Sequence, residues 1–311
     1  MHTPTIKRAG WAVITLLIVL IGCKKSTDMA TPASQECQLQ SEIINGGPQA
    51  TTYTYNENGQ LVKRVTPSSS GTPSTYTYAY DAAGNVISAL SQINVINNNF
   101  TVTGTYEYTD GRLTKIVSKS SSSILASTTD SYSYDAHGRI ATYSYSSTDQ
   151  QYGTESYTFT NGLLTSGAIT RGGQSLTVTV ENGRIASIDH PDGRKSRNTY
   201  DAKGYLTRTD NVDKSGALLS YTTNEYSTTA YKRANAPYQV VPAINLYGNT
   251  ELPLARGAVY NADGSLKAET QYQYQVNSKG YITTLSSTQN QPGVGNGQST
   301  TSIAYTYGNC Q

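Results

Sequence analysis

Few residues of this 311-residue chain suggest catalysis or metal binding. Beyond the first 22 residues there are two histidines, His137 and His190, and each lies among turn-forming residues. Neither has cysteines or carboxylates at the spacing of a metal site, and no nucleophile motif accompanies them. We therefore predict no catalytic residue, no cofactor and no metal ion, and we expect both histidines to be solvated.

The acidic and hydroxyl side chains have structural explanations. Most aspartates, such as Asp81, Asp135 and Asp201, stand at the first position of an expected turn, where a carboxylate bonds backbone N–H groups. The turns lack the Gly-Gly-x-Gly-x-Asp pattern of calcium-binding β-rolls, and no Gly-x-Ser-x-Gly elbow occurs. The chain is predicted not to be an enzyme.

Tyrosine is the residue type that stands out, with 26 copies against 2 phenylalanines. Tyrosines at alternate positions, such as Tyr76, Tyr78 and Tyr80, or Tyr143 and Tyr145, lie on one face of a strand. Rows of rings with hydroxyl tips suit the binding of sugar rings. The same rows suit the core of a tyrosine-rich sheet, which is the interpretation we favour.

These tyrosines belong to a hairpin motif that recurs along the chain. In residues 132–140, alternating tyrosines predict a strand, Asp135-Ala-His-Gly138 predicts a turn, and Ile140 begins the returning strand. Six copies have four turn residues, at 56–59, 81–84, 135–138, 201–204, 261–264 and 277–280, and three have two, at 110–111, 161–162 and 182–183. The short forms are Asp-Gly or Asn-Gly, which favour type I′ turns. Each turn ends on a glycine with an expected positive φ: Gly59, Gly84, Gly111, Gly138, Gly162, Gly183, Gly204, Gly264 and Gly280.

The motif also specifies strand register, because a one-residue slip would turn each side chain to the other face. The expected pairs join an aromatic or β-branched residue to an aliphatic one: Tyr55 with Leu61, Tyr134 with Ile140, Tyr200 with Leu206, Tyr108 with Leu113, Phe159 with Leu164, and Val180 with Ile185. In returning strands, Leu113 and Ile116 are three residues apart, as are Ile185 and Ile188, and Ile282 and Leu285. Either bulges intervene, or both faces of the sheet are partly buried.

The turn signals recur every ~8–13 residues, as an all-β meander requires, and no window has a sustained helical period. We predict one all-β domain over residues 37–311, an antiparallel meander of about twenty short strands. The listed turns are expected at one edge of a sheet that is curled, either open or barrel-like. A lipid-facing band of Leu, Val and Phe is missing, so the domain is not expected to span a membrane.

The first 22 residues are predicted to be a signal peptide. Lys7 and Arg8 precede an apolar stretch over residues 11–21 that is too short to span a bilayer. Leu20-Ile-Gly22-Cys23 resembles a bacterial lipobox, so we expect lipid attachment at Cys23. Residues 23–36 are polar and without periodicity, and we expect them to form a flexible tether.

Charge and cysteine content fit an exported protein. Without Lys7 and Arg8, 21 basic residues balance 21 acidic residues, and no basic patch suggests nucleic-acid binding. With Cys23 modified by lipid, Cys37 and Cys310 remain as an even pair at the two ends of the repeats. We predict a disulfide between them, which would require the ends of the sheet to meet or the tether to reach back.

The repeat lapses between Tyr226 and Arg256. Pro237, Pro242 and Pro253 interrupt this segment, and proline is poorly tolerated inside central strands. We expect an excursion, at about residues 227–256, that lies over a sheet face or covers an edge. Whether it is a functional loop or a cover for apolar surface stays open at this point.

The Tyr-x-Tyr-Asp-x-x-Gly-Arg pattern resembles the YD repeat of Rhs-type proteins. Residues 37–310 resemble more closely the YD-repeat cell-envelope lipoproteins of Bacteroidota, a family of uncharacterised function described as having a porin-like fold. The resemblance rests on the turn copies, on the proline-rich interruption before Leu252-Pro253, and on the ending Tyr305-Thr-Tyr307-Gly-Asn-Cys310. It implies a curled, barrel-like meander.

The sequence thus predicts a non-enzymatic cell-envelope lipoprotein, a structural or interaction scaffold that engages protein or glycan. The alternative is a carbohydrate-binding protein of a nutrient-uptake system, with a glycan hydrolase further behind. The expected partner is the membrane, through an N-terminal lipid, most simply the outer membrane. The facing side, the ligand and the oligomeric state stay open.

Overall fold

The computed structural model describes residues 37–311 except 48, 69–70, 96–97, 123–124, 150–152, 233–245, 248–251, 293–296 and 309–311. The expected signal peptide, the tether and Cys23 therefore lie outside the described residues. The described residues form one sheet of twenty strands. The strands are β1 (Gln38–Ile44), β2 (Thr51–Tyr55), β3 (Leu61–Thr66), β4 (Ser74–Tyr80), β5 (Val86–Val95), β6 (Asn98–Thr109), β7 (Arg112–Ser120), β8 (Thr128–Tyr134), β9 (Ile140–Ser147), β10 (Thr154–Thr160), β11 (Leu163–Arg171), β12 (Gln174–Glu181), β13 (Arg184–Asp189), β14 (Lys195–Tyr200), β15 (Leu206–Val212), β16 (Leu218–Tyr226), β17 (Leu254–Asn261), β18 (Leu266–Val276), β19 (Ile282–Asn290) and β20 (Gln298–Gly308).

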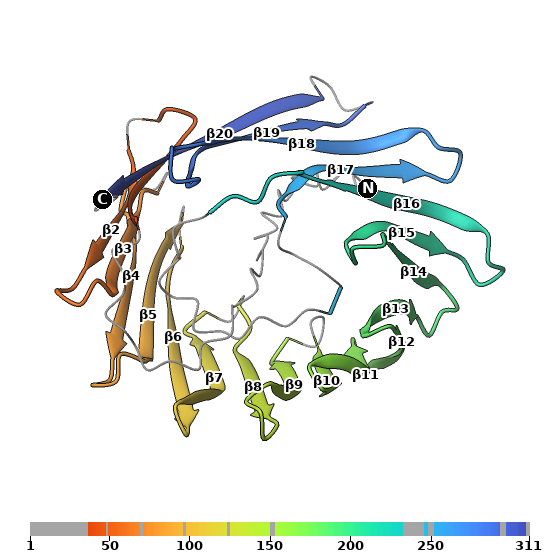
Figure 1. Cartoon of the computed structure of the whole chain (residues 1–311), viewed down its shortest axis with the longest axis horizontal. Coiled ribbons are helices and arrows are strands. Elements are labelled where there is room, and N and C mark those ends of the chain that lie inside the picture. The colour runs from red at the N-terminus through yellow and green to blue at the C-terminus, as the bar shows by residue number, and fades with distance from the viewer. Residues whose placement is uncertain are drawn as a thin grey trace, which may run out of the picture.

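The sheet is a meander that closes on itself. Each strand pairs antiparallel with its neighbours in sequence, and β1 also pairs with β20. Leu39 of β1 lies opposite Tyr307 of β20, which repeats the pairing of a tyrosine with an aliphatic residue seen inside the hairpins. The predicted all-β meander is confirmed, and the curled sheet is a closed barrel (Figure 1). Closure leaves no unpaired sheet edge.

The hairpin turns have the expected local chemistry. Asp135 accepts hydrogen bonds at Oδ1 from the backbone N–H groups of His137 and Arg139, both at 2.9 Å. Gly138 donates its N–H to the Asp135 carbonyl at 2.9 Å and has a φ of 76°. All nine of the turn glycines have positive φ, and so do Asp110, Asn161 and Asn182 in the two-residue turns, as type I′ geometry requires.

All six expected cross-strand pairs are present, including Tyr134 with Ile140 and Phe159 with Leu164. One residue is inserted shortly after each aliphatic residue, for example Thr114 between Leu113 and Lys115. The same bulge occurs between Ile185 and Ser187 and between Ile282 and Thr284. Leu113 and Ile116 therefore share a face, as do the other pairs of residues three apart in the returning strands. Of the two alternatives, bulges and burial on both faces, the structure has bulges.

One turn lies at the edge opposite to the one we expected. The turn at 261–264 follows the odd-numbered strand β17, whereas the other eight listed turns follow even-numbered strands. Because connections of a meander alternate between the two edges, residues 261–264 belong to the far edge. The excursion after β16 takes the place of a tight turn and so shifts the sequence signal to the next connection.

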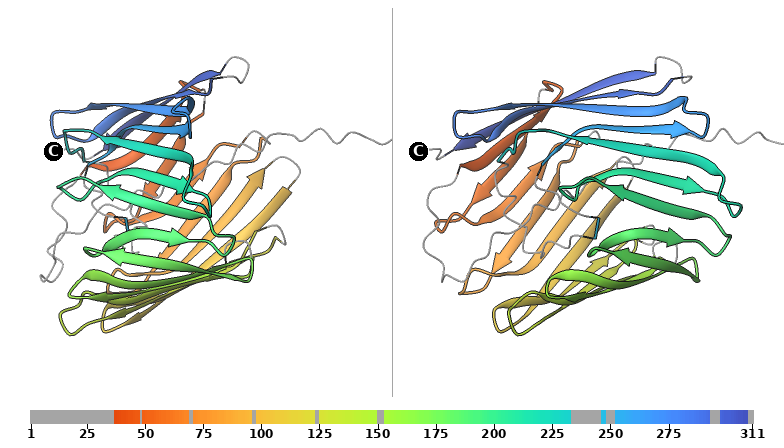
Figure 2. Two further views of the ribbon diagram at one scale, coloured as in Figure 1. Left: turned by 90° about the vertical axis from the view of Figure 1, so that its right-hand side faces the viewer. Right: turned by 45° about the vertical axis from the view of Figure 1, so that its right-hand side comes forward.

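The two faces of the sheet differ in composition. In β10, exposed Thr154, Ser156 and Thr158 alternate with less exposed Glu155, Tyr157 and Phe159. Leu246, from the excursion, packs against the tyrosine face, and the short described piece at 246–247 is drawn inside the ring of strands (Figure 1). The tyrosine face is therefore the inner wall, and the threonine and serine face is the outer wall. Figure 2 shows the strands tilted around the barrel.

Candidate functional site

Tyrosine hydroxyls join neighbouring hairpins around the barrel. Tyr134 of β8 donates its hydroxyl to the Leu113 carbonyl of β7 at 2.7 Å, and Tyr200 of β14 donates to Ile185 of β13 at 2.7 Å. The rule is constant: a tyrosine near the end of an even-numbered strand bonds the carbonyl of the first aliphatic residue in the preceding strand. The other donors are Tyr55, Tyr80, Tyr108, Tyr226, Tyr274 and Tyr307. We call this series the hydroxyl ladder.

The hydroxyl ladder is interrupted on β10 and β12, where Phe159 and Val180 occupy the corresponding positions. There the inner wall is apolar: Tyr157, Leu164, Ile169, Leu176 and Ile185 form a buried cluster, packed against by Phe159, Val178, Val180, Ile188 and Leu246. The Leu246 carbonyl also accepts a hydrogen bond from the Ile185 N–H at 3.0 Å. Leu246 of the excursion thus packs on the stretch of wall where the hydroxyl ladder is interrupted.

The excursion contacts the wall at a second place. Lys232 donates its N–H to the Gly280 carbonyl at 2.8 Å and accepts from the Ile282 N–H at 3.0 Å, as an isolated bridge beside β19. Its ammonium lies 5.6 Å from the centre of the Tyr281 ring. The described parts of the excursion therefore bind β13 and β19 rather than an edge. Leu246 packs on apolar surface, as a cover would, and the role of the whole excursion stays a prediction. Residues 233–245 and 248–251, with Pro237 and Pro242, lie outside the described residues.

Beside the apolar cluster, polar side chains gather on the inner wall. Tyr132, Tyr143 and Tyr157 form a row across β8, β9 and β10, with ring centres 5.3 and 6.1 Å apart. Tyr143 donates its hydroxyl to Asp130 at 2.8 Å, and Tyr157 donates to Glu155 at 2.9 Å. Arg171 of β11 bonds the other Glu155 oxygen at 2.7 Å. We call Asp130, Tyr143, Tyr145, Glu155, Tyr157 and Arg171 the inner-wall cluster.

Strand register places the members of the inner-wall cluster. Tyr145 lies opposite Asp130 on one side and Glu155 on the other. Tyr157 lies opposite Gly167, where an added Cβ would lie 2.8 Å from the tyrosine ring. A residue without a side chain is therefore needed at 167 to admit that ring. The ring is 2% exposed, which makes Tyr157 the packed base of the cluster.

The protonation chemistry of the cluster follows from burial. Burial raises the pKa of the Asp130 carboxyl, and the hydrogen bond from Tyr143 partly offsets this. Burial and the nearby carboxylates raise the pKa values of the Tyr143 and Tyr157 hydroxyls, so both remain donors at neutral pH. The bond to Glu155 raises the pKa of Arg171, which stays charged. The cluster can thus donate and accept hydrogen bonds next to aromatic rings.

The histidines are placed apart from this cluster. His137 is an exposed residue inside its turn. His190 is half-buried instead of fully solvated. It takes the first position of a turn, where its N–H donates to the Arg194 carbonyl and its carbonyl accepts from the Gly193 N–H. Within the described ranges, no three His, Cys, Asp or Glu side chains come together to hold a metal ion.

Of the predicted tyrosine rows, Tyr76, Tyr78 and Tyr80 line the inner wall of β4, and their chemistry is structural. Tyr80 belongs to the hydroxyl ladder, and the Arg64 guanidinium lies 4.6 Å from the centre of the Tyr76 ring. Tyr143 and Tyr145 belong to the inner-wall cluster. The prediction that tyrosines form the packed face of the sheet is therefore confirmed for the ladder residues.

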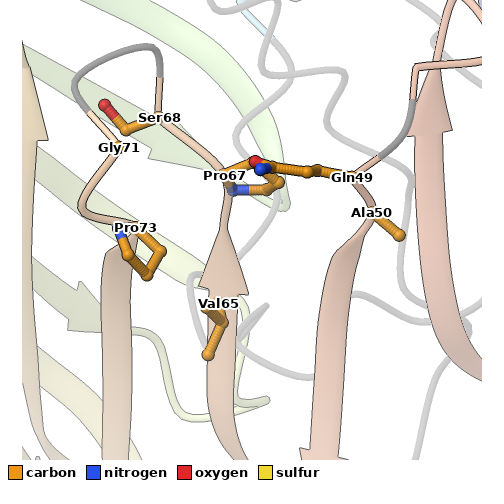
Figure 3. Close-up of a pocket in the computed structure, with 7 residues that line it drawn as sticks. All are labelled: Gln49, Ala50, Val65, Pro67, Ser68, Gly71 and Pro73. Atoms are coloured by element: carbon orange, nitrogen blue, oxygen red, sulfur yellow. The ribbon is translucent and has the colours of Figure 1, made fainter.

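A pocket lies at the barrel edge beside the ends of β3 and β4 (Figure 3). Its volume is about 350 Å³, and its lining residues are Gln49, Ala50, Val65, Pro67, Ser68, Gly71 and Pro73. None of these side chains titrates near neutral pH, and the Ser68 hydroxyl already donates to the Asn94 carbonyl at 2.6 Å. The pocket could hold a small group, but its lining residues offer no acid, base or nucleophile for catalysis.

Cys37 is buried and disulfide-bonded at the start of β1. The next residue, Gln38, lies opposite Gly308 of β20, two residues before Cys310. Cys310 lies outside the described residues, so its pairing with Cys37 stays a prediction.

Asp130, Glu155 and Arg171 belong to no turn of the hairpin motif, and we did not expect them at a site. A signal was present, because Asp130-x-Tyr132 and Glu155-x-Tyr157 place a carboxylate two residues before a tyrosine, on the same strand face. We expected most aspartates in turns, whereas Asp130, like Asp189 and Asp210, lies inside a strand.

Two kinds of solved structure resemble this fold. A porin-like protein from Bacteroides uniformis is 13% identical, with a TM-score of 0.33 over 89% of this chain and 100% of that one. A porin-like protein from Bacteroides vulgatus is 10% identical, with a TM-score of 0.37 over 88% of this chain and 99% of that one. The TcdB2-TccC3-TEV structure is 14% identical, with a TM-score of 0.43 over 84% of this chain and 13% of that one. No family model and no curated protein matches. Likenesses this distant carry no argument about activity, and membership of the YD-repeat family stays a prediction.

Proposed function

We propose that this chain is a non-enzymatic lipoprotein of the cell envelope, held by a lipid on Cys23, whose closed barrel is a scaffold that engages protein or glycan. The observation that carries the proposal is the polar outer wall. On β9, for example, Thr142, Ser144 and Ser146 are exposed on this wall. Such a wall suits water and not lipid, so the anchor would have to be the N-terminal lipid.

Within the described ranges the structure has no helix that could cross a membrane. One feature of the sequence supports the proposed anchor. The sequence places Leu20-Ile-Gly22-Cys23 at the end of an apolar stretch that is too short to span a bilayer. We place the anchor in the outer membrane and leave open which side the barrel faces.

Carbohydrate binding in nutrient uptake is the second candidate, and the inner-wall cluster favours it. A hydrolase is less favoured, although Asp130 and Glu155 lie only two strands apart. Both carboxylates already accept bonds from tyrosine hydroxyls, and Glu155 is also held by Arg171. These contacts fix the side chains as hydrogen-bonding partners rather than leaving a general base free to approach a water molecule.

Cell fractionation tests the proposal. The full chain should sediment with membranes when expressed in a bacterium that processes lipoproteins. Cys23→Ala should appear in the soluble fraction or accumulate as the unprocessed precursor, while Cys37→Ala, as the matched control, should stay with the membranes. Equal membrane association of the wild type and Cys23→Ala would contradict the lipid anchor.

A further inference from the structure

The charged side chains of the inner wall are unevenly distributed. Among the paired strand residues, those on the tyrosine face are Glu42, Arg64, Asp130, Glu155 and Arg171. Three of these five belong to the inner-wall cluster on β8, β10 and β11. Glu155 and Arg171 pair with each other and Asp130 accepts from Tyr143, so these charges are compensated within the cluster. They concentrate polar chemistry on one stretch of the inner wall.

Further along the inner wall, strands β14–β16 use amides and hydroxyls instead. Ser196 donates to Asn211 at 2.9 Å, and Thr209 donates to Asn198 at 2.9 Å. Asn211 in turn donates to Ser220 at 3.3 Å. This stretch of wall is uncharged but forms hydrogen bonds throughout, a surface that suits a ligand with many hydroxyl groups.

The inner-wall cluster adds what such a ligand needs for orientation. The Arg171 side chain is 53% exposed and uses one of its nitrogens on Glu155. Its planar fork carries five N–H donors, so it can bond a ligand as well. Tyr145 is a half-buried residue between the two carboxylates, and half-buried Tyr143 lies on the same strand between Tyr132 and Tyr157. Aromatic rings pack against the C–H face of a sugar, while guanidinium and carboxylate groups bond its hydroxyls.

The charge balance selects among ligands. Two carboxylates and one guanidinium carry both signs within the same group, so an anionic ligand would meet Asp130 and Glu155, and a cationic one would meet Arg171. Sugar hydroxyls both donate and accept hydrogen bonds, so they can use all three groups. An uncharged ligand therefore fits the cluster better than a charged one.

We propose that the inner wall at β8–β11 binds an uncharged oligosaccharide, with Arg171 and Glu155 bonding its hydroxyls and Tyr145 packing against a ring. The inference rests on the proposed function, because it names the ligand of that scaffold. It assigns Arg171 as the residue that orients the ligand and Tyr157 as the packed support beneath it.

The test is binding of the full chain, purified in detergent, to an array of uncharged glucans, mannans, galactans and xylans, with acidic glycans alongside. The best uncharged ligand is then titrated by calorimetry against two variants. Arg171→Lys keeps the charge but loses the planar fork, and affinity should fall about tenfold, the loss expected for one charge-assisted hydrogen bond.

Arg208→Lys is the matched control. Arg208 is a strand arginine on the outer wall, 39% exposed, paired with Asp210 at 2.7 Å and packed 4.0 Å from the centre of the Tyr221 ring. The affinity of the Arg208→Lys variant for the glycan should stay within about twofold of the wild-type affinity. The melting temperatures of both variants should lie within a few degrees of the wild-type value, as for most substitutions of partly exposed residues.

Three outcomes would overturn the inference: no uncharged glycan is bound, only acidic glycans are bound, or the two variants lose affinity equally. These outcomes leave the lipid anchor untouched, since anchoring is measured on Cys23. Conversely, an unmodified Cys23 would refute the proposed envelope anchor and leave the binding titration valid.

Discussion

Replacing Tyr134 by phenylalanine isolates one rung of the hydroxyl ladder. The ring stays in place opposite Ile140, and only the hydroxyl that donates to the Leu113 carbonyl at 2.7 Å is lost. A hydrogen bond of this kind contributes about 1 kcal/mol, and a carbonyl left desolvated without a donor costs roughly 1–3 kcal/mol. We expect the free energy of unfolding to fall by about 1–2 kcal/mol, the lower part of that range because the site is half-buried.

Two controls decide whether the hydroxyl is responsible. Tyr221→Phe removes a hydroxyl from an outer-wall ring whose contacts are with Tyr260 and Arg208, and it should change stability by less than about 0.5 kcal/mol. Phe159→Tyr adds the missing hydroxyl on β10, and by the rule of the ladder it should reach the Ile140 carbonyl and be tolerated. Urea unfolding followed by circular dichroism measures all three. An unchanged midpoint for Tyr134→Phe, or equal losses for Tyr134→Phe and Tyr221→Phe, would refute the ladder as a source of stability.

Three further predictions concern the turns, the tyrosine protons and the chain ends. Gly138→Val places a β-branched residue at a φ of 76° and should cost roughly 1–3 kcal/mol, while His137→Ala should be nearly neutral; equal denaturant midpoints would contradict this. Burial raises the pKa values of Tyr55, Tyr108 and Tyr200 from 10.0 to about 12. The stability that these protonated hydroxyls contribute should therefore be complete below pH 10 and be lost as the pH rises toward 12. Melting temperatures that increase between pH 10 and pH 12 would contradict this prediction. Non-reducing peptide mapping should recover a Cys37–Cys310 peptide, and two free thiols under oxidising conditions would exclude the bond.

The hairpins could be predicted from sequence because their determinants are local. Asp135, Gly138 and the alternating tyrosines lie within a few residues of one another, and the side-chain period of two then decides which residues pair. The bulges after Leu113 and Ile185 were only one of two alternatives, because spacing alone cannot distinguish an inserted residue from burial on both faces.

Closure, the excursion and the inner-wall cluster depend on contacts between distant residues. Leu39 opposite Tyr307 is a pair that no turn connects. Leu246 accepts a hydrogen bond from the N–H of Ile185, which is far away along the chain, beside the two strands where the hydroxyl ladder is interrupted. No local pattern connects these positions. The turn at 261–264 was assigned to the wrong edge because the excursion replaced one turn without changing the local motif.

The mass of the N-terminal peptide of the membrane-extracted protein tests the proposed lipid anchor. This peptide should begin at Cys23 and carry the added mass of acyl chains, with residues 1–22 removed. A membrane-bound chain whose Cys23 is unmodified, or whose N-terminus retains residues 1–22, would contradict the lipid-anchored scaffold.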